Sequence, residues 1–294
     1  SNRSTSLTSQ GLPRGPPHCS GSYIRGLPTP MVSESVCSEI KAKYYAGAYS
    51  ACVALCRSTA ADGWVLLYLV RSLLRAEGAD AAMQAVEDNP CEDSAAFRLC
   101  IDPSCPVESV GDSEVASVVL GEHWLRAGEA GRALSVLHGL ETAEAHALRV
   151  SAYVSMSRHD MAKDELVTLQ TTHPDTPEAL LCEAHLALAC GDGAGALAPI
   201  SELRGIGGES IRLCVLEASA HLLQMDTLGD RSLEEATTLI DRGYSMAGGA
   251  RDADLLSLRL TLLCRLGEDR ARIARAQQEL RAVAPQHPLA MEDC

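Results

Sequence analysis

The chain has 294 residues and a formal net charge of −14, with 46% apolar and 22% charged residues. These values are typical of a globular protein and exclude a largely disordered chain, a collagen and a disulfide-scaffold toxin. The longest strongly apolar run, Trp64–Val70, is far shorter than the roughly 20 residues that a membrane-spanning helix needs. Aromatic residues make up only 3%, so Leu, Ala and Val must build the core, which favours an all-α protein.

The charge is unevenly distributed. Residues 1–33 contain three Arg and no acidic residue, so all 39 acidic residues lie in the rest of the chain. The chain after residue 33 is acidic enough to repel the phosphate backbone of a nucleic acid, and we therefore expect no nucleic-acid partner. The densest basic stretch, Arg265–Arg281, is interleaved with acidic residues. It is typical of a solvated helix face or a local patch for an acidic partner.

The twelve cysteines form no CxxC motif. The nearest loop pair, Cys100 and Cys105, lacks the further Cys or His ligands of a zinc site, and we predict no metal and no cofactor. Packed thiols are indicated at four positions inside apolar helical patterns, namely Cys182, Cys190, Cys214 and Cys264. Because buried thiols without a ligand pattern fit a reducing compartment and no secretory apolar segment precedes the helical region, we expect a cytoplasmic protein.

In chain order, residues 1–33 are rich in Ser, Pro and Gly and are predicted to be a disordered N-terminal extension. Residues 34–294 are predicted to form one domain of helices and short turns. Seven segments share a layout in which a helix ends, a turn follows, and the next helix begins with a small residue that often precedes a large apolar one by four positions. These segments are 45–52, 75–82, 127–133, 157–162, 191–196, 231–236 and 267–272.

The spacing of these segments identifies the repeat. Ala162 and Ala196 are 34 residues apart, which is the tetratricopeptide period. Gly121 takes the small position where the two helices of such a repeat cross, and Pro174 takes the proline position between repeats. We predict six to eight tetratricopeptide-like helix pairs stacked into a right-handed α-solenoid.

Two regions depart from the repeat. Residues 91–111 contain several Pro and Cys, and we expect one helix over Ser94–Cys100, followed by a loop, in place of a full pair. Ala196 and Ala236 are 40 residues apart, and the excess is expected in a polar loop at 226–232.

Several motifs superficially suggest catalysis. Gly205–Ser210 and Gly191–Gly195 resemble phosphate and dinucleotide loops, but each follows a helix and lacks the accompanying strand or Lys. We interpret both as turns between helices, with an open helix N-terminus after Ser210. His159-Asp160 also falls in a turn, and His185 and His221 lie on apolar faces typical of packing residues. No catalytic triad or metalloprotease spacing is present, which predicts a protein that is not an enzyme and has no small-molecule substrate.

The functional surface of a solenoid is its concave face, lined by the first helix of each pair. The residues predicted there form an apolar groove, suited to a helix or long hydrophobic segment of a partner. They are Val118, Glu122, Leu125, Ala147, Ser151, Val154, Leu181, His185, Leu188, Val215, Ser219 and Leu222. Some of these positions are expected to pack within the superhelix instead. A clamp for a C-terminal carboxylate is not expected, because none of the three Lys (Lys41, Lys43, Lys163) is at these positions.

Read in order, the segments resemble one family, the epsilon subunit of the coatomer. The resemblance covers roughly residues 34–292 and depends on co-linear order more than on any single motif. It is carried by Ile40–Cys52, Leu66–Tyr68, Gly131–His138, Ala147–Val150, Asp160–Leu166 and Gln286–Leu289. Residues 87–113 are shorter than in that family and the loop at 225–232 is longer.

The resemblance implies a non-enzymatic structural subunit of the COPI vesicle coat. Such a subunit wraps and stabilises the C-terminal domain of the coatomer alpha subunit, and through it joins the rest of the coatomer. It acts in Golgi-to-ER retrograde and intra-Golgi transport, is peripheral to the Golgi membrane and the coated vesicle, and contacts membrane only indirectly.

Two alternatives stay open. One is a generic tetratricopeptide adaptor of another cytosolic complex, for a chaperone or for trafficking. The other is an enzyme with a thiol site at Cys100 or Cys105, which requires a cysteine of lowered pKa.

Overall fold

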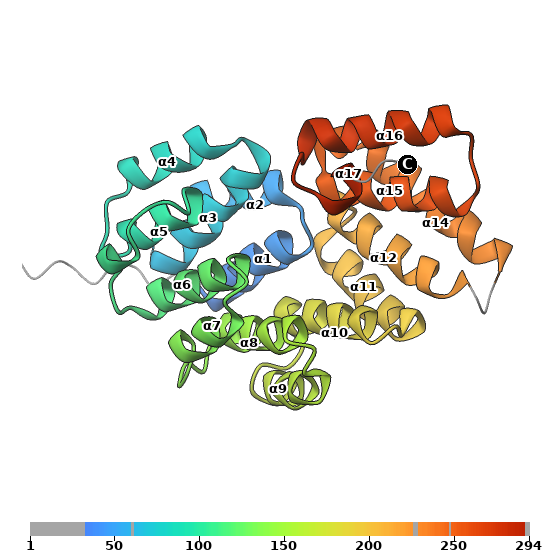
Figure 1. Ribbon diagram of the computed structural model, residues 1–294. Coiled ribbons are helices and arrows are strands. Elements are labelled where there is room, and N and C mark those ends of the chain that lie inside the picture. The colour runs from blue at the N-terminus through green and yellow to red at the C-terminus, as the bar shows by residue number, and fades with distance from the viewer. Residues whose placement is uncertain (1–32, 60–61, 226–228, 247, 292–294) are drawn as a thin grey trace, which may run out of the picture. The chain divides into compact units, whose positions relative to one another are not determined.

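The computed structural model describes residues 33–59, 62–225, 229–246 and 248–291. These residues form sixteen α-helices and two 3₁₀ turns, with no strand among them, which confirms the all-α solenoid (Figure 1). Apart from Ser33, the predicted extension at residues 1–33 lies outside the described residues.

Seven antiparallel helix pairs contain most of the described residues. They are α1 (Glu34–Tyr45) with α2 (Tyr49–Arg57), α3 (Gly63–Ala76) with α4 (Ala79–Asp88), α6 (Glu114–Arg126) with α7 (Ala130–Val136), α8 (Ala143–Ser155) with α9 (His159–Thr172), α10 (Pro177–Ala189) with α11 (Gly193–Gly207), α12 (Ile211–Leu223) with α14 (Asp230–Ser245), and α15 (Ala253–Arg265) with α16 (Arg270–Val283). The remaining elements are α5 (Ser94–Ile101), η1 (Val107–Ser109), η2 (Gly249–Arg251) and α17 (Pro288–Met291).

Side-chain caps fix where most of these pairs begin. Eight helices start after a Ser, Thr or Asp whose side-chain oxygen accepts the backbone N–H three residues further on. Such a cap contributes about 1 kcal/mol by satisfying a donor that the helix leaves free. Six of the eight open the first helix of a pair, and in α10 Pro177 takes the first position instead. The start of each first helix is therefore encoded locally.

The small residues of the repeat are buried as predicted. Cys52 of α2 and the alanines at 82, 133, 162, 196 and 236 are all 0% exposed. At Gly121, an added Cβ would lie 2.8 Å from Leu137, so α6 and α7 cross where the sequence predicts. The seventh segment differs, because Ala271 and Arg272 are exposed and the small residue that α16 buries is Ala276.

The irregular regions are partly as expected. Residues 91–111 hold the single helix α5 and the short turn η1, which confirms the reduced pair. In the predicted loop at 226–232, residues 226–228 lie outside the described residues and α14 already begins at Asp230. The turn predicted at Gly205–Ser210 is confined to residues 208–210, because α11 extends through Gly207, and the predicted open helix N-terminus is wrong, because the Ser210 side chain caps α12.

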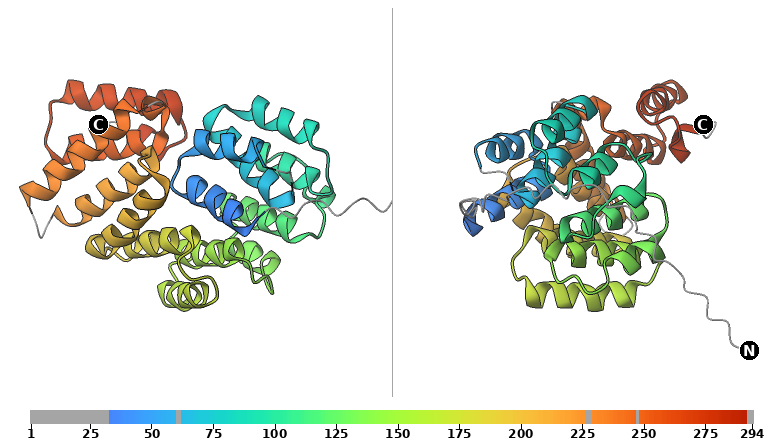
Figure 2. Two further views of the ribbon diagram at one scale, coloured as in Figure 1. Left: turned by 180° about the vertical axis from the view of Figure 1, so that it is seen from behind. Right: turned by 90° about the vertical axis from the view of Figure 1, so that its left-hand side faces the viewer.

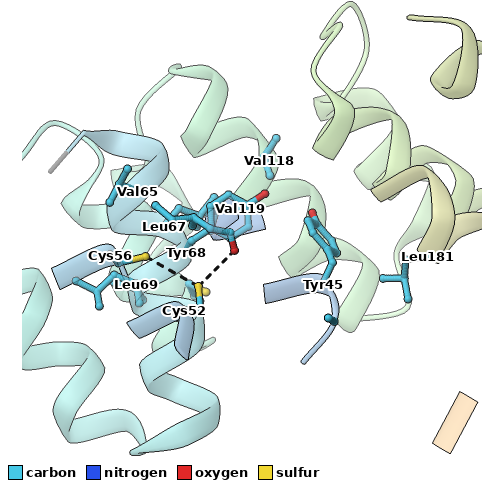
Figure 3. Close-up of a cluster of buried hydrophobic side chains, with 14 of the residues drawn as sticks. Tyr45, Cys52, Cys56, Val65, Leu67, Tyr68, Leu69, Val118, Val119 and Leu181 are labelled. Atoms are coloured by element: carbon cyan, nitrogen blue, oxygen red, sulfur yellow. Dashed lines mark hydrogen bonds between the residues drawn. The ribbon is translucent and has the colours of Figure 1, made fainter. Parts of the chain in front are cut away.

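The first helix of the domain packs against the middle of the chain. Helix α1 contacts α10 and α11 as well as α2 and α3, and Figure 2 (left) shows α1 and α2 (blue) in front. The largest core cluster contains Tyr45 of α1, Cys52 of α2, Tyr68 of α3 and Leu181 of α10 (Figure 3). The hydrophobic core therefore joins helices that are far apart in the sequence.

This contact depends on a glycine. Gly207 ends α11 where an added Cβ would overlap the Cβ of Ala46, the residue that caps α1. The Ser210 hydroxyl, three residues on, donates a hydrogen bond to the Ala46 carbonyl. Backbone contact at this point leaves no room for a side chain at position 207.

We expect Gly207→Ala to destabilise the protein and Gly205→Ala to stabilise it, although both residues lie in α11. At position 207 the overlap with Ala46 should cost about 1–3 kcal/mol. At position 205 nothing lies within 4 Å of an added Cβ, and the helix should gain about 0.5–1 kcal/mol. Urea unfolding gives both values. Equal effects of the two changes would contradict the packing described here.

Candidate functional site

The twelve residues predicted for partner binding lie on four consecutive inner helices. Helices α6, α8, α10 and α12 carry three residues each, and each of these helices packs against the next. All twelve residues therefore lie on the first helix of a pair. The twelve side chains differ in solvent exposure, from fully buried core residues to exposed ones.

Three of the twelve side chains belong to the hydrophobic core. Val118 is fully buried, and Leu181 and Leu222 are 6% and 7% exposed. Leu125, Ala147, Leu188, Val215 and Ser219 are half-buried. The core positions hold the inner helices together and leave little surface for a partner.

Glu122 is engaged in an ion-pair cluster. Its carboxylate accepts hydrogen bonds from both Arg71 of α3 and Arg126 of α6. Arg71 is 6% exposed, and its guanidinium lies 6.0 Å from the centre of the Tyr44 ring. Although burial opposes the charged form, the two arginines outweigh it and lower the pKa of Glu122. The cluster ties α3 to α6 on the inner side.

A second polar cluster joins α1 to α8 and α10, and the sequence reasoning did not predict it. Lys41 Nζ of α1 lies 2.7 Å from Glu144 Oε1 and 3.3 Å from Glu178 Oε1. The Tyr68 hydroxyl of α3 donates a hydrogen bond of 2.7 Å to Glu144. One signal was available, since Glu144 and Glu178 are 34 residues apart and are acidic residues within apolar segments.

The opening on the inner side is an apolar pocket between α8 and α10. It has a volume of about 310 Å³ and includes three of the predicted residues, Ser151, Val154 and His185. Burial, with the charge of Arg212 adding to it, lowers the pKa of His185 to about 4, so its ring is neutral at physiological pH. The pocket lies at the small end of the range for ligand sites and suits one or two uncharged side chains of a partner.

The cysteines proposed for thiol chemistry do not have the required environment. Cys100 is 3% exposed, and burial raises its pKa, which is opposite to what a reactive thiol needs. Cys105 is half-buried in the loop before η1. Cys182 and Cys214 are buried as predicted, but the prediction for Cys190 and Cys264 is wrong, because both are exposed.

The described residues offer few other candidates. No group of three or more His, Cys, Asp or Glu side chains among them is arranged to hold a metal ion. No helix in this part of the chain is long and apolar enough to cross a membrane. His221, predicted to be a packing residue, is 9% exposed and lies 3.1 Å from Glu235.

Comparison with solved structures supports the repeat architecture. A tetratricopeptide repeat protein from Parabacteroides merdae ATCC 43184 is similar over 85% of this chain and 94% of its own, with a TM-score of 0.50 and 14% identity. A chain of the APC/C hetero-tetramer Cut9-Hcn1 is similar over 87% of this chain and 46% of its own, with a TM-score of 0.49 and 12% identity. At this identity the first likeness shows the fold alone. No curated protein sequence matches the chain.

The sequence itself identifies the family. The sequence-family model described as coatomer epsilon subunit matches residues 34–293, nearly the whole chain. This agrees with the resemblance found in the order of the repeat segments, and the helical repeat architecture is consistent with it. The chain therefore belongs to the coatomer epsilon subunit family.

Proposed function

We propose that this chain is a non-enzymatic structural subunit of the COPI coat that binds the C-terminal domain of the coatomer alpha subunit. The observation that supports this proposal is the family match over residues 34–293. Within that role it stabilises the alpha subunit in the coat during Golgi-to-ER and intra-Golgi transport. It acts from the cytoplasm, peripheral to the Golgi membrane, and reaches the membrane only through the other coatomer subunits.

We further propose that the partner contacts the inner side at the apolar pocket of α8 and α10. The pocket is lined by Val150, Ser151, Val154, Ser155, Cys182 and His185. Ser151 and Ser155 donate their hydroxyl hydrogen bonds to carbonyls of α8 itself, and the imidazole is neutral. A partner segment with apolar side chains suits such a surface, because it leaves no charge unpaired when water is excluded.

We expect the full chain, used as bait in cytosol, to recover the alpha subunit together with the other coatomer subunits. Mass spectrometry identifies the recovered proteins, and a direct titration with the purified C-terminal domain of the alpha subunit measures the affinity. Recovery of chaperones or of an unrelated trafficking complex, without coatomer, would favour the generic adaptor and refute the coat function.

We expect Ser151→Glu to weaken binding to the alpha subunit by about tenfold or more, because it places an unpaired charge at the pocket. Ser135→Glu on the outer helix α7 should leave binding unchanged. The two serines are matched, since both are exposed and each donates a hydrogen bond of 3.0 Å to the carbonyl four residues earlier. Isothermal titration calorimetry measures both affinities, and circular dichroism checks that helicity is retained. Wild-type affinity in Ser151→Glu would place the contact on another face.

A further inference from the structure

The cluster between α1, α8 and α10 contains more negative than positive charge. Among the described residues, Lys41 is the only cation paired with the carboxylates of Glu144 and Glu178. The Lys41 side chain is 25% exposed, whereas Glu144 is 3% and Glu178 is 0% exposed. Two carboxylates beside one ammonium leave one negative charge without compensation, away from water.

The two carboxylates are not equivalent. Glu144 accepts one hydrogen bond from the Tyr68 hydroxyl and lies at hydrogen-bonding distance from Lys41. Neither side-chain oxygen of Glu178 has a partner in hydrogen-bond geometry among the described residues, and its contact with Lys41 is longer, at 3.3 Å. A buried carboxylate with weaker partners than its neighbour is the one whose charged form is more disfavoured.

We propose that the packing of α1 against α10 depends on a proton. A proton on the Glu178 carboxyl stabilises this packing, and loss of that proton weakens it. The uncharged acid removes the surplus charge and leaves Lys41 paired with Glu144. The ionised form needs water or another cation. Since Glu178 is fully buried beneath α1, water reaches it only when α1 moves away from α10.

The titration directions agree with this geometry. Burial, with the charge of Glu144 adding to it, raises the pKa of Glu178 despite the opposing charge of Lys41. Burial also opposes the charged form of Glu144, but Lys41 and the Tyr68 hydroxyl outweigh it and lower the pKa of Glu144. When two carboxylates share a site in this way, the proton resides on the less stabilised one.

The other titratable groups around the cluster keep their charge state near neutral pH. On α1, the pKa of Lys41 is raised because the two glutamates outweigh the effect of burial. Burial raises the pKa of Cys37 and of Tyr45, which lie on the same helix. From α3, burial raises the pKa of Tyr68, and Glu122 outweighs burial to raise that of Arg71. From α10, burial raises the pKa of Cys182 to about 12; the charge of Arg212 on α12 opposes this. Glu178 is the group here whose shift brings its titration toward the neutral range.

The direction of the pH effect follows from linkage. A carboxyl whose pKa is higher in the folded state than in the unfolded chain stabilises the fold only while it is protonated. Its contribution is present at low pH and is lost as the pH rises from the unfolded value through the folded one. Glu144 has the opposite sign, because its pKa is lowered, and its contribution is lost as the pH falls through its folded pKa.

We expect Glu178→Gln in the full chain to be more stable than the wild type at pH 8, with the difference shrinking toward pH 5. The neutral amide reproduces the protonated acid at all pH values, so the variant should lack this part of the pH dependence. Glu144→Gln serves as the comparison. It removes the well-bonded carboxylate and should be less stable than the wild type at pH 8. Urea unfolding from pH 5 to pH 9 measures both.

Hydrogen exchange locates the effect. After correction for intrinsic exchange chemistry, opening of α1 should increase in the wild type as the pH rises above the ordinary glutamate pKa of about 4.3, by up to about tenfold for each unit by which folding raises the pKa of Glu178. It should stay nearly constant in Glu178→Gln, and exchange in α16, which packs against α15 and α17, should be unaffected. A Glu178→Gln variant that is less stable than the wild type at pH 8, or that keeps the wild-type pH dependence of α1 exchange, would overturn the proposal. The proposal does not depend on the identity of the partner, so it survives or fails separately from the coat function.

Discussion

The close approach of α1 to the end of α11 is the constraint on which the inner side of this solenoid depends. It requires a glycine at 207 and a small residue at 46, and the Ser210 hydroxyl fixes it by donating to the Ala46 carbonyl. Because the first helix is held against the middle of the chain, α1 and α3 face α6, α8 and α10 across short ion pairs and hydrogen bonds. Side chains that an open solenoid would present to a partner are therefore used to hold the protein together.

This arrangement divides the inner side into two chemical regions. At the N-terminal ends of α8 and α10, the carboxylates of Glu144 and Glu178 are buried around Lys41. Toward the C-terminal halves of the same helices, the surface becomes an uncharged pocket that includes Val154 and His185. The polar region is occupied by residues of the chain itself. The apolar region has unfilled volume, which is the reason that the proposed partner contact is placed there.

Much of the fold could be predicted because its determinants are local. Small residues at the repeat positions, such as Ala162 and Ala196, and capping residues at the helix starts are read from short stretches of sequence. The burial of Leu181 and the pairing of Lys41 could not be predicted in the same way. Both involve the packing of α1 against α10. This contact joins segments more than a hundred residues apart, and no periodic pattern in the sequence encodes it.

Glu144 and Glu178 show how such a contact changes the chemistry of a repeat. Each is the second residue of its helix, and the two are separated by one tetratricopeptide period, so their local environments are alike. An open array of repeats would give both the same hydration and similar acidity. Here one lysine and one tyrosine hydroxyl arrive from helices outside the repeat, and they stabilise Glu144 more than Glu178. The repeat therefore determines where the acidic residues lie, whereas the packing of α1 against α8 and α10 determines which of them is the weaker acid.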